Sequence, residues 1–369
     1  MRLLDRYQLR ELAVAFAYCL AGILVFWVSF ELLEEIGELR RGNVGAAGLV
    51  LYLWYRVPVQ LQLQVPVALL LSMLYVLTQH MRHNELVAMR AAGLSLWRIS
   101  LPYVGVGVAC SLGMYALNEY AVPDAAAKAN AILNEASGKD SGWRAKVNFL
   151  DSETGRIWNL DAFHVGSAEL KGAHVRWVAP GGAREELIAE HGHWEDSGWV
   201  FERVTRLTFP PGADAEVLQI RTNRLVVKDF PETPAHLRSE VKISQWLGSS
   251  KKSRQIQLSL REIMTYRELH PRLSPRFDAL LRTWFHDRLA LPWTCLVVIL
   301  IAIPAGVGTG RRNLFVGVAA TVFFAFAFFV VKEFSLALGA GGYVAPWLAA
   351  WAPNLLFGGA GFVAMLRVQ

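Results

Sequence analysis

Six long apolar segments constrain this chain more than any other feature of its sequence. They lie at about residues 12–30, 58–78, 99–117, 289–307, 314–331 and 345–365, so that three precede and three follow a polar region. A helix needs about 20 mostly apolar residues to cross a bilayer, and each segment approaches or meets that length. Only 18% of the residues are charged, whereas a soluble protein carries about 25%. The sequence therefore predicts an integral membrane protein with six transmembrane helices in a 3+3 arrangement.

The first apolar segment follows Arg2, Arg6 and Arg10, as the hydrophobic part of a signal peptide would. It is too long for that role, and it continues into "SFELLEE", which lacks the small-residue pattern of a cleavage site. We therefore expect a retained helix whose N-terminus is cytoplasmic.

Basic residues flank the apolar segments mainly on one side of the predicted bilayer. They are Arg2, Arg6, Arg10, Arg82, Arg90, Arg98, Arg311, Arg312 and Arg367. Cytoplasmic loops carry the excess of Lys and Arg in membrane proteins. We therefore predict that both termini are cytoplasmic and that the polar middle is periplasmic, in a multi-pass protein of the inner membrane. The net charge of +6 follows from these flanking residues and does not indicate a nucleic-acid partner.

The polar middle has the pattern of an all-β domain. Its segments "GRIWNLDAFHVG", "GAHVRWVAPGGA", "HGHWEDSGWVFERVTRLTF" and "AEVLQIRTNRLVV" are rich in Val, Trp, Phe and Ile and are bounded by turn residues. Trp199, Phe201 and Arg203 alternate as on one face of a strand, and "EDSG" predicts a hairpin turn before Trp199. The three cysteines all lie in apolar segments, so no disulfide supports this region. We expect a sandwich or an open, jelly-roll-like domain.

Three domains follow from these patterns. Residues 1–122 hold the first three transmembrane helices, 123–257 the periplasmic β domain, and 258–369 an amphipathic linker followed by the last three helices. In the linker, Leu260, Ile263, Met264 and Leu269 stand at helical spacing. The similar stretches "ELHPRLSP" and "FHDRLALP" are either a coincidence, which we favour, or a repeat.

The stretch "NELVAMRAAGLS" lies between the second and third apolar segments and belongs to neither. Asn84 is a preferred N-cap residue and Gly93 a preferred helix end, so we predict a short cytoplasmic helix over residues 84–93. Its alanines leave little side-chain bulk on part of the surface, which permits close docking into another protein's groove. The alternative is an interfacial helix that lies against lipid.

The sequence offers no means of hydrolysing a nucleotide or driving ions by itself. "GVGTGRRN" at residues 306–313 is glycine-rich but lacks the Lys of a phosphate-binding loop. Ionisable residues are missing from the middles of the six apolar segments, where ion-coupled transport would place them. Lys332 and Glu333 come nearest, and we interpret them as a snorkelling interfacial pair rather than an ion site.

Enzyme and metal chemistry find equally little support. His191 and His193 are spaced for one face of a strand, with His164 and His174 elsewhere in the polar middle. A catalytic zinc needs about three protein ligands in a recognisable pattern, and no H-E-x-x-H is found. No G-x-S-x-G nucleophile pattern is present either. We predict a non-catalytic chain without cofactor or metal, whose work a partner must power.

Several segments together resemble the LptF/LptG family of lipopolysaccharide export permeases. They are "LLDRYQLREL", "NELVAMRAAGLSLWRI", "NEYAVPDA", "HDRLALPWTCLVVILIAIPAGVG" and "APWLAAWAPNLLF", which cover both membrane halves in the family's order. The resemblance implies a heterodimer with a second, homologous permease on two copies of a cytoplasmic ATPase subunit. It also implies that lipopolysaccharide leaves the inner membrane and passes through an open jelly roll to a periplasmic bridge of similar domains.

The resemblance further implies roles for individual residues. "NELVAMRAAG" corresponds to the coupling helix that is seated in the ATPase groove, with Glu85 as its acidic contact and Arg90 as an auxiliary one. Ala91, Ala92 and Gly93 complete this coupling surface. The similarity does not say which of the two paralogous permeases the chain is, which residues line the lipid cavity, or whether a third protein adds a helix.

Basic residues at headgroup depth are candidates for the phosphates of lipid A. A Lys or Arg near the membrane surface contributes about 1 kcal/mol toward anionic lipid, and Arg can bind phosphate bidentately. The candidates are Arg40, Arg41, Arg56 and Arg288. Ordinary snorkelling arginines remain the alternative for each of them.

Two other functions fit the same pattern. One is a permease of this architecture for another lipid or a lipoprotein. The other is a membrane-anchored scaffold whose β domain binds an envelope partner and transports nothing.

Overall fold

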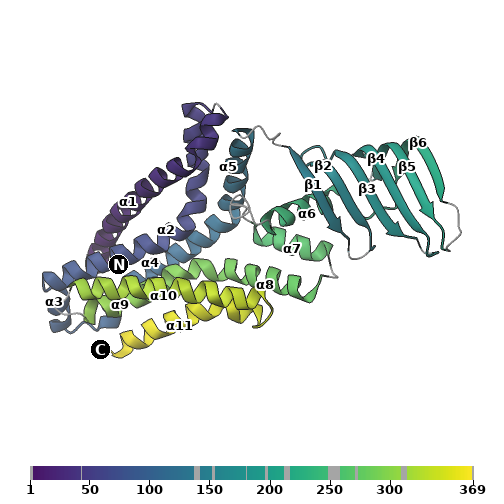
Figure 1. Ribbon diagram of the computed structural model, residues 1–369. Coiled ribbons are helices and arrows are strands. Elements are labelled where there is room, and N and C mark those ends of the chain that lie inside the picture. Colours follow the sequence, from purple (N-terminus) through teal and green to yellow (C-terminus); the bar gives the residue numbers. More distant parts are fainter. Residues whose placement is uncertain are drawn as a thin grey trace. The chain divides into compact units, whose positions relative to one another are not determined.

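The computed structural model describes residues 3–42, 44–136, 142–151, 154–179, 181–195, 198–211, 217–247, 258–270, 273–308 and 314–367 (Figure 1). Contacts within the chain divide it into two compact units. The first comprises Met1–Arg40, Val44–Ala129 and Pro275–Gln369, and the second comprises Arg41–Asn43 and Asn130–Ser274. The domain boundaries drawn from the sequence stay predictions.

The first unit is helical. Its elements are α1 (Leu3–Arg41), α2 (Ala46–Arg82), α3 (Glu85–Ala91), α4 (Leu96–Ala116), a π-helical turn (Leu117–Ala121), the first half of α5 (Val122–Ala136), α8 (Pro275–Ala290), a 3₁₀ turn (Leu291–Trp293), α9 (Thr294–Gly308), α10 (Leu314–Ala340) and α11 (Pro346–Arg367). From Asn130 onward, α5 belongs to the second unit. Among the described residues, six helical stretches are long and apolar enough to cross a membrane, as predicted. They are Leu3–Gly37, Ala46–Arg82, Leu96–Ala136, Pro275–Gly306, Val322–Ala340 and Pro346–Arg367.

Several helices extend beyond the apolar segments that predicted them. The 39 residues of α1 span roughly 58 Å at the usual rise, about twice the hydrocarbon thickness of a bilayer. Prolines mark the local irregularities. The π-helical turn Leu117–Ala121 precedes Pro123, and the 3₁₀ turn contains Pro292. Because proline has no N–H and its ring crowds the preceding turn, it distorts the regular ladder at such places.

The core of the first unit forms where α2, α4, α9 and α11 meet. Met73 of α2, Tyr103 of α4 and Ile299 of α9 are almost fully buried. Glycines allow the helices to approach closely: a Cβ on Gly361 of α11 would lie 2.7 Å from the backbone oxygen of Leu300 in α9. Small residues at such crossings are typical of membrane helix packing, which depends on van der Waals contact.

The second unit holds one six-stranded antiparallel sheet. Its strands β1 (Trp143–Leu150), β2 (Ile157–His164), β3 (Leu170–Val178), β4 (Arg184–Glu195), β5 (Gly198–Phe209) and β6 (Leu218–Val227) follow one another in sequence order across the sheet. Glu195 of β4 pairs with Gly198 of β5, so the predicted hairpin forms, although its two central residues lie outside the described part. The described pairings give a meander, and jelly-roll topology stays a prediction.

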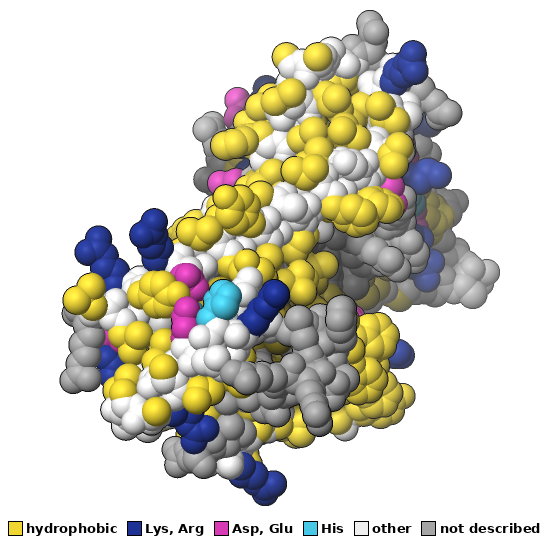
Figure 2. Space-filling model, turned by 90° about the vertical axis from the view of Figure 1, so that its left-hand side faces the viewer, with side chains coloured by type: hydrophobic (Ala, Val, Ile, Leu, Met, Phe, Trp, Pro, Cys, Tyr) yellow, Lys and Arg dark blue, Asp and Glu magenta, His cyan; other side chains and the backbone are white. Residues whose placement is uncertain are grey.

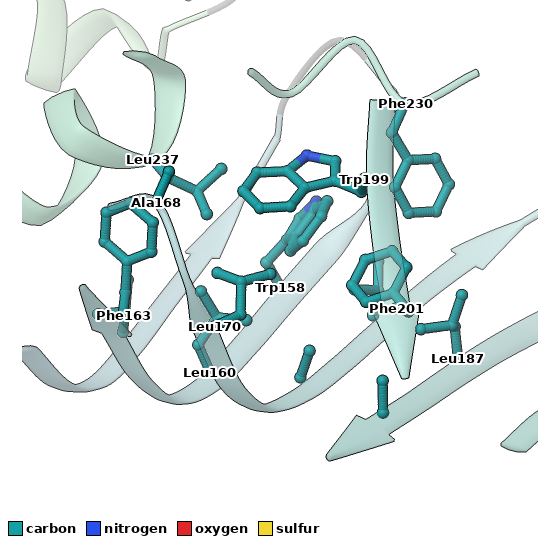
Figure 3. Close-up of a cluster of buried hydrophobic side chains, with 14 of the residues drawn as sticks. Trp158, Leu160, Phe163, Ala168, Leu170, Leu187, Trp199, Phe201, Phe230 and Leu237 are labelled. Atoms are coloured by element: carbon teal, nitrogen blue, oxygen red, sulfur yellow. The ribbon is translucent and has the colours of Figure 1, made fainter. Parts of the chain in front are cut away.

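One face of the sheet carries the core of this unit (Figure 3). Trp158 of β2 and Trp199 and Phe201 of β5 are fully buried there, and Phe230 and Leu237 cover them from the segment after β6. The Trp199 indole Nε1 donates to the backbone oxygen of Glu232 at 2.6 Å. This bond satisfies the only polar atom of a buried indole, which would otherwise be costly to desolvate.

In each of the first five strands, the alternation of buried and exposed residues shifts by one position at the same level of the sheet. The residues at this level form a line across the strands: Lys146, Asp161, Gly172, Glu190 and Arg203. In β2, Trp158 and Leu160 face the core, but the next buried aromatic residue is Phe163. Pairing is interrupted along this line, where three alternate strands have positive φ at Lys146 (56°), Gly172 (59°) and Arg203 (51°). Gly172 is required because a Cβ there would lie 1.9 Å from Oδ2 of Asp161. The phase of the alternation therefore changes where these residues interrupt the pairing.

One sequence prediction fails at this line. We expected Trp199, Phe201 and Arg203 on one face of a regular strand. Trp199 and Phe201 are buried, but the side chain of Arg203 is 59% exposed and pairs with Glu190 at 2.8 Å, while Val204 turns inward in its place. The positive φ of Arg203 changes the phase, because a one-residue slip moves every later side chain to the other face.

Two helices complete the second unit, α6 (Pro234–Leu247) and α7 (Leu260–Leu269). Ser259 and Glu262 form a capping box that fixes the start of α7. Ile263 and Tyr266 are buried, whereas Met264, expected on the apolar face, is 45% exposed. The helix after the predicted β domain is therefore amphipathic, but its buried face is rotated towards Tyr266.

Candidate functional site

The predicted helix of "NELVAMRAAGLS" is α3, which extends from Glu85 to Ala91. Gly93 ends it with a φ of +86°, as expected. Asn84 departs from the prediction: its φ is 60° and its side chain makes no cap hydrogen bond. A left-handed Asn84 completes the tight turn from α2 instead, a conformation that Asn tolerates better than most residues.

The two faces of α3 differ sharply. Leu86 is buried and packs with Leu96 and Ile99 of α4, and Met89 covers this contact. The opposite face exposes Ala88, Arg90, Ala91, Ala92 and Gly93. Four of these five residues have at most a methyl group as side chain. The helix is therefore anchored to the bundle on one side. Its exposed surface is made of these small residues, the cation of Arg90 and the side chain of Val87, which is 55% exposed.

Glu85 faces inward as well as outward, which the sequence did not predict. Its Oε2 lies 2.6 Å from Nδ1 of the buried His80, and the hydroxyl of Tyr7 lies 3.3 Å from both carboxylate oxygens. On its other side, Nε2 of His80 lies 3.1 Å from the hydroxyl of Tyr103. These contacts connect α3 with α1, α2 and α4, and about a third of the Glu85 side chain stays exposed.

The four predicted lipid-phosphate residues have different environments. Arg40 is exposed near the end of α1, and the side chain of Arg41 lies outside the described part. Arg56 is largely buried and its Nε lies 2.7 Å from Oε1 of Glu31. Arg288 donates to the backbone oxygen of Asn118 at 3.2 Å. Arg56 and Arg288 thus have contacts within the chain. Among the residues that the structure describes, the predicted phosphate-binding arginines do not form one cluster.

The environment of Glu31 explains the buried pair. Its Oε1 also accepts a hydrogen bond from the hydroxyl of Tyr52 at 2.8 Å, so both Arg56 and Tyr52 hold one carboxylate. A buried charge needs such partners, because its transfer from water is otherwise prohibitive. Of this trio, the sequence analysis singled out only the cation.

Another buried pair corrects the interpretation of Lys332. We expected an interfacial pair of Lys332 and Glu333, yet Nζ of Lys332 lies 3.2 Å from Oδ1 of Asp287 in α8. Both side chains of this pair are largely buried, and Glu333 is exposed. Residues adjacent on a helix point in different directions, so Lys332 reaches a neighbouring helix instead.

Two of the histidines singled out in the sheet contact carboxylates. His174 lies 3.0 Å from Oε2 of Glu186, and His193 approaches Glu195 and Glu202. Within the described ranges, no three His, Cys, Asp or Glu side chains gather as metal ligands would.

The family described as "Lipopolysaccharide export system permease LptF/LptG" matches residues 6–367, which is nearly the whole chain. No curated protein matched the sequence. The match extends through both helical halves and the sheet, and the six candidate spans fit a multi-pass protein of the inner membrane. The chain therefore belongs to the LptF/LptG family of lipopolysaccharide export permeases.

Proposed function

We propose that this permease is one transmembrane subunit of an ATP-driven complex that extracts lipopolysaccharide from the inner membrane and passes it to a periplasmic bridge. In this proposal a separate ATPase dimer supplies the energy, a second homologous permease completes the membrane part, and the sheet of the second unit transfers the lipid. Both termini and α3 are cytoplasmic, and the sheet is periplasmic.

The observation that carries the proposal is the two-sided character of α3. A helix that only rests on lipid would expose most of its large apolar residues. Leu86 and Met89 face the bundle instead, and Val87 is the one large apolar side chain of α3 that is exposed, at 55%. The exposed ridge consists of Ala88, Arg90, Ala91, Ala92 and Gly93. Small residues permit close approach of a rigid partner, and the contacts of Glu85 with α1 and α2 would transmit its motion to the spans.

Co-purification of the ATPase subunit tests this proposal. Ala91→Trp adds bulk to the exposed ridge without touching the buried side of α3, so the chain should fold and lose the ATPase. Ala127→Trp, at an exposed position of α5, is the matched control and should keep it. If Ala91→Trp retains both the ATPase and lipid export, α3 is not the docking surface.

The proposal also includes phosphate binding by Arg40 and Arg41 beyond the first span. Arg40 is exposed there and accessible to a headgroup. Replacing both residues by Glu should lower lipopolysaccharide binding to the purified complex and reduce its amount in the outer membrane. Unchanged binding by this double variant would remove both residues from the proposed site.

A further inference from the structure

A cavity of about 660 Å³ lies between α1 and α2, beside α3. This volume is within the range of small-molecule sites. Figure 2 views the end at which α3 lies in Figure 1, and it shows acidic, histidine and basic side chains side by side on a largely hydrophobic surface. We propose that the cavity binds the headgroup of a zwitterionic phospholipid that carries a primary ammonium, as phosphatidylethanolamine does. The proposal does not depend on the proposed function, because neither lipopolysaccharide nor the ATPase enters it.

The polar end of the cavity has charges of both signs. Arg10 supplies a guanidinium, and Glu11 and Glu85 supply two carboxylates, all on its lining. A guanidinium binds phosphate bidentately, and an ammonium donates hydrogen bonds to carboxylates. Because the two acids outnumber the one arginine, a purely anionic headgroup would meet net repulsion. A headgroup with one phosphate and one ammonium matches the arrangement.

One aromatic ring adds to the recognition of a cation. Tyr7, next to Glu85, also lines the cavity, and a cation over a tyrosine face gains about 0.5–1 kcal/mol at an exposed site. Tyr18 and Tyr75 are 76% and 57% exposed. They therefore stand at the mouth, where a lipid could enter from the side of the bundle.

The other end of the cavity is apolar. It lies further along α1 and α2 and is lined by Val14, Ala15, Cys19 and Val76, beside the exposed rings of Tyr18 and Tyr75. Val14 is half exposed, so this wall continues onto the outer surface of a helix that we treat as membrane-spanning. An acyl chain can follow that surface while its headgroup occupies the polar end. The amphipathic lining thus fits a lipid better than a soluble metabolite.

The location gives the site a consequence for α3. His80 and Glu85, the pair that connects α2 with α3, are both on the cavity lining. An ammonium bound to Glu85 would compete with His80 and Tyr7 for its carboxylate oxygens. Occupancy of the cavity would therefore change how firmly the first turn of α3 is held.

Lipid retention by the purified full-length protein, with the subunits that accompany it, tests the site. The delipidated protein is titrated with phosphatidylethanolamine or phosphatidylglycerol, and bound lipid is counted by native mass spectrometry. We expect at least about tenfold tighter binding of phosphatidylethanolamine, and loss of this preference in the double variant Arg10→Gln, Glu11→Gln. The control pair Arg6→Gln, Glu333→Gln changes exposed charges off the cavity lining and should keep it.

A second variant guards against a folding defect. Val14→Trp occupies the apolar end at an exposed position, leaves every charge in place, and should also lower phosphatidylethanolamine retention. Equal retention of both lipids by the unaltered protein, or unchanged preference in both the double variant and Val14→Trp, would overturn the proposal. Retention of neither lipid would overturn it as well.

Discussion

The imidazole Nδ1 of His80 lies 2.6 Å from Oε2 of Glu85, so a buried residue in the last turn of α2 holds the first residue of α3. Between them are only the turn residues His83 and Asn84 and the end of α2. The Tyr7 hydroxyl reaches the same carboxylate from α1. The short helix is consequently fixed to two spans by its first side chain, while its exposed ridge remains accessible.

Replacing His80 should loosen α3. His80→Ala removes the 2.6 Å contact of Glu85, which keeps only the longer one to Tyr7, and it removes the His80 contact of the Tyr103 hydroxyl. Losses of this kind cost about 1–3 kcal/mol. Hydrogen exchange of the α3 amides should then become about 5–150 times faster. His83→Ala alters an exposed neighbour and serves as control. Equal exchange in the two variants would show that His80 does not hold the helix.

The buried pair of Arg56 and Glu31 should show strong coupling. Their side chains are only 12% and 7% exposed, and removal of one partner from a buried ion pair costs about 3–5 kcal/mol. Arg56→Met or Glu31→Gln alone should lower the thermal stability of the detergent-purified protein markedly.

The double variant is the control for this pair. Arg56→Met with Glu31→Gln removes both charges of this contact together, so part of the lost stability should return. The return should be incomplete, because the neighbouring Glu35 is also buried and loses its interaction with Arg56. A double variant whose loss equals the sum of the two single losses would indicate that the charges do not interact. That result would also leave Arg56 available to a lipid phosphate.

Apolar length and turn chemistry were sufficient to predict the largest elements. Each of the six apolar segments became a candidate span, because a backbone in hydrocarbon must satisfy its own hydrogen bonds within a helix. The β4–β5 hairpin likewise formed where turn residues separate two strands, with Trp194 paired to Trp199 one residue from the strand ends. Such local rules act over a few residues and can be read without the fold.

Contacts between distant residues could not be predicted in this way. Tyr7 and Glu85 are 78 positions apart, and Lys332 finds Asp287 on another helix rather than its neighbour Glu333. The slip in the sheet is similar. Positive φ at Lys146 and Arg203 has no signal in the residue types, because neither is a residue that favours this region. Only Gly172, also on that line, could have hinted at it.

Stability of the second unit should depend on pH through His270. Burial opposes its charge, but Glu240 at 2.8 Å and the backbone oxygen of Tyr266 outweigh this and raise its pKa above the usual 6.5. The carboxylate of Asp151 acts in the same direction, and the ring of His236 packs edge-on against that of His270. A raised folded-state pKa adds stability that is complete below 6.5 and is lost as pH rises through the folded value.

Thermal unfolding of the full-length protein between about pH 6 and 8 measures this effect. The unfolding temperature should fall across the range, and it should fall less in His270→Gln, which cannot take up a proton. Burial also raises the pKa of Glu232. The stability that this shift contributes is likewise lost as pH rises above about 4.5, the ordinary pKa of a glutamate. Comparing the variant with the unaltered protein isolates the histidine. Parallel curves for the two proteins would refute its contribution.

The crossing of α9 and α11 should not tolerate a methyl group at Gly361. A Cβ there would lie 2.7 Å from the oxygen of Leu300 and 3.0 Å from the nitrogen of Ile301, both rigid backbone atoms. Overpacking of this kind costs about 1–3 kcal/mol.

Gly359, two residues earlier in the same helix, has nothing within 4 Å of its Cβ position. Gly359→Ala should therefore be neutral or stabilising by up to about 1 kcal/mol through helix propensity, while Gly361→Ala should lower the unfolding temperature. Equal unfolding temperatures for the two alanine variants would mean that α9 and α11 do not pack this closely.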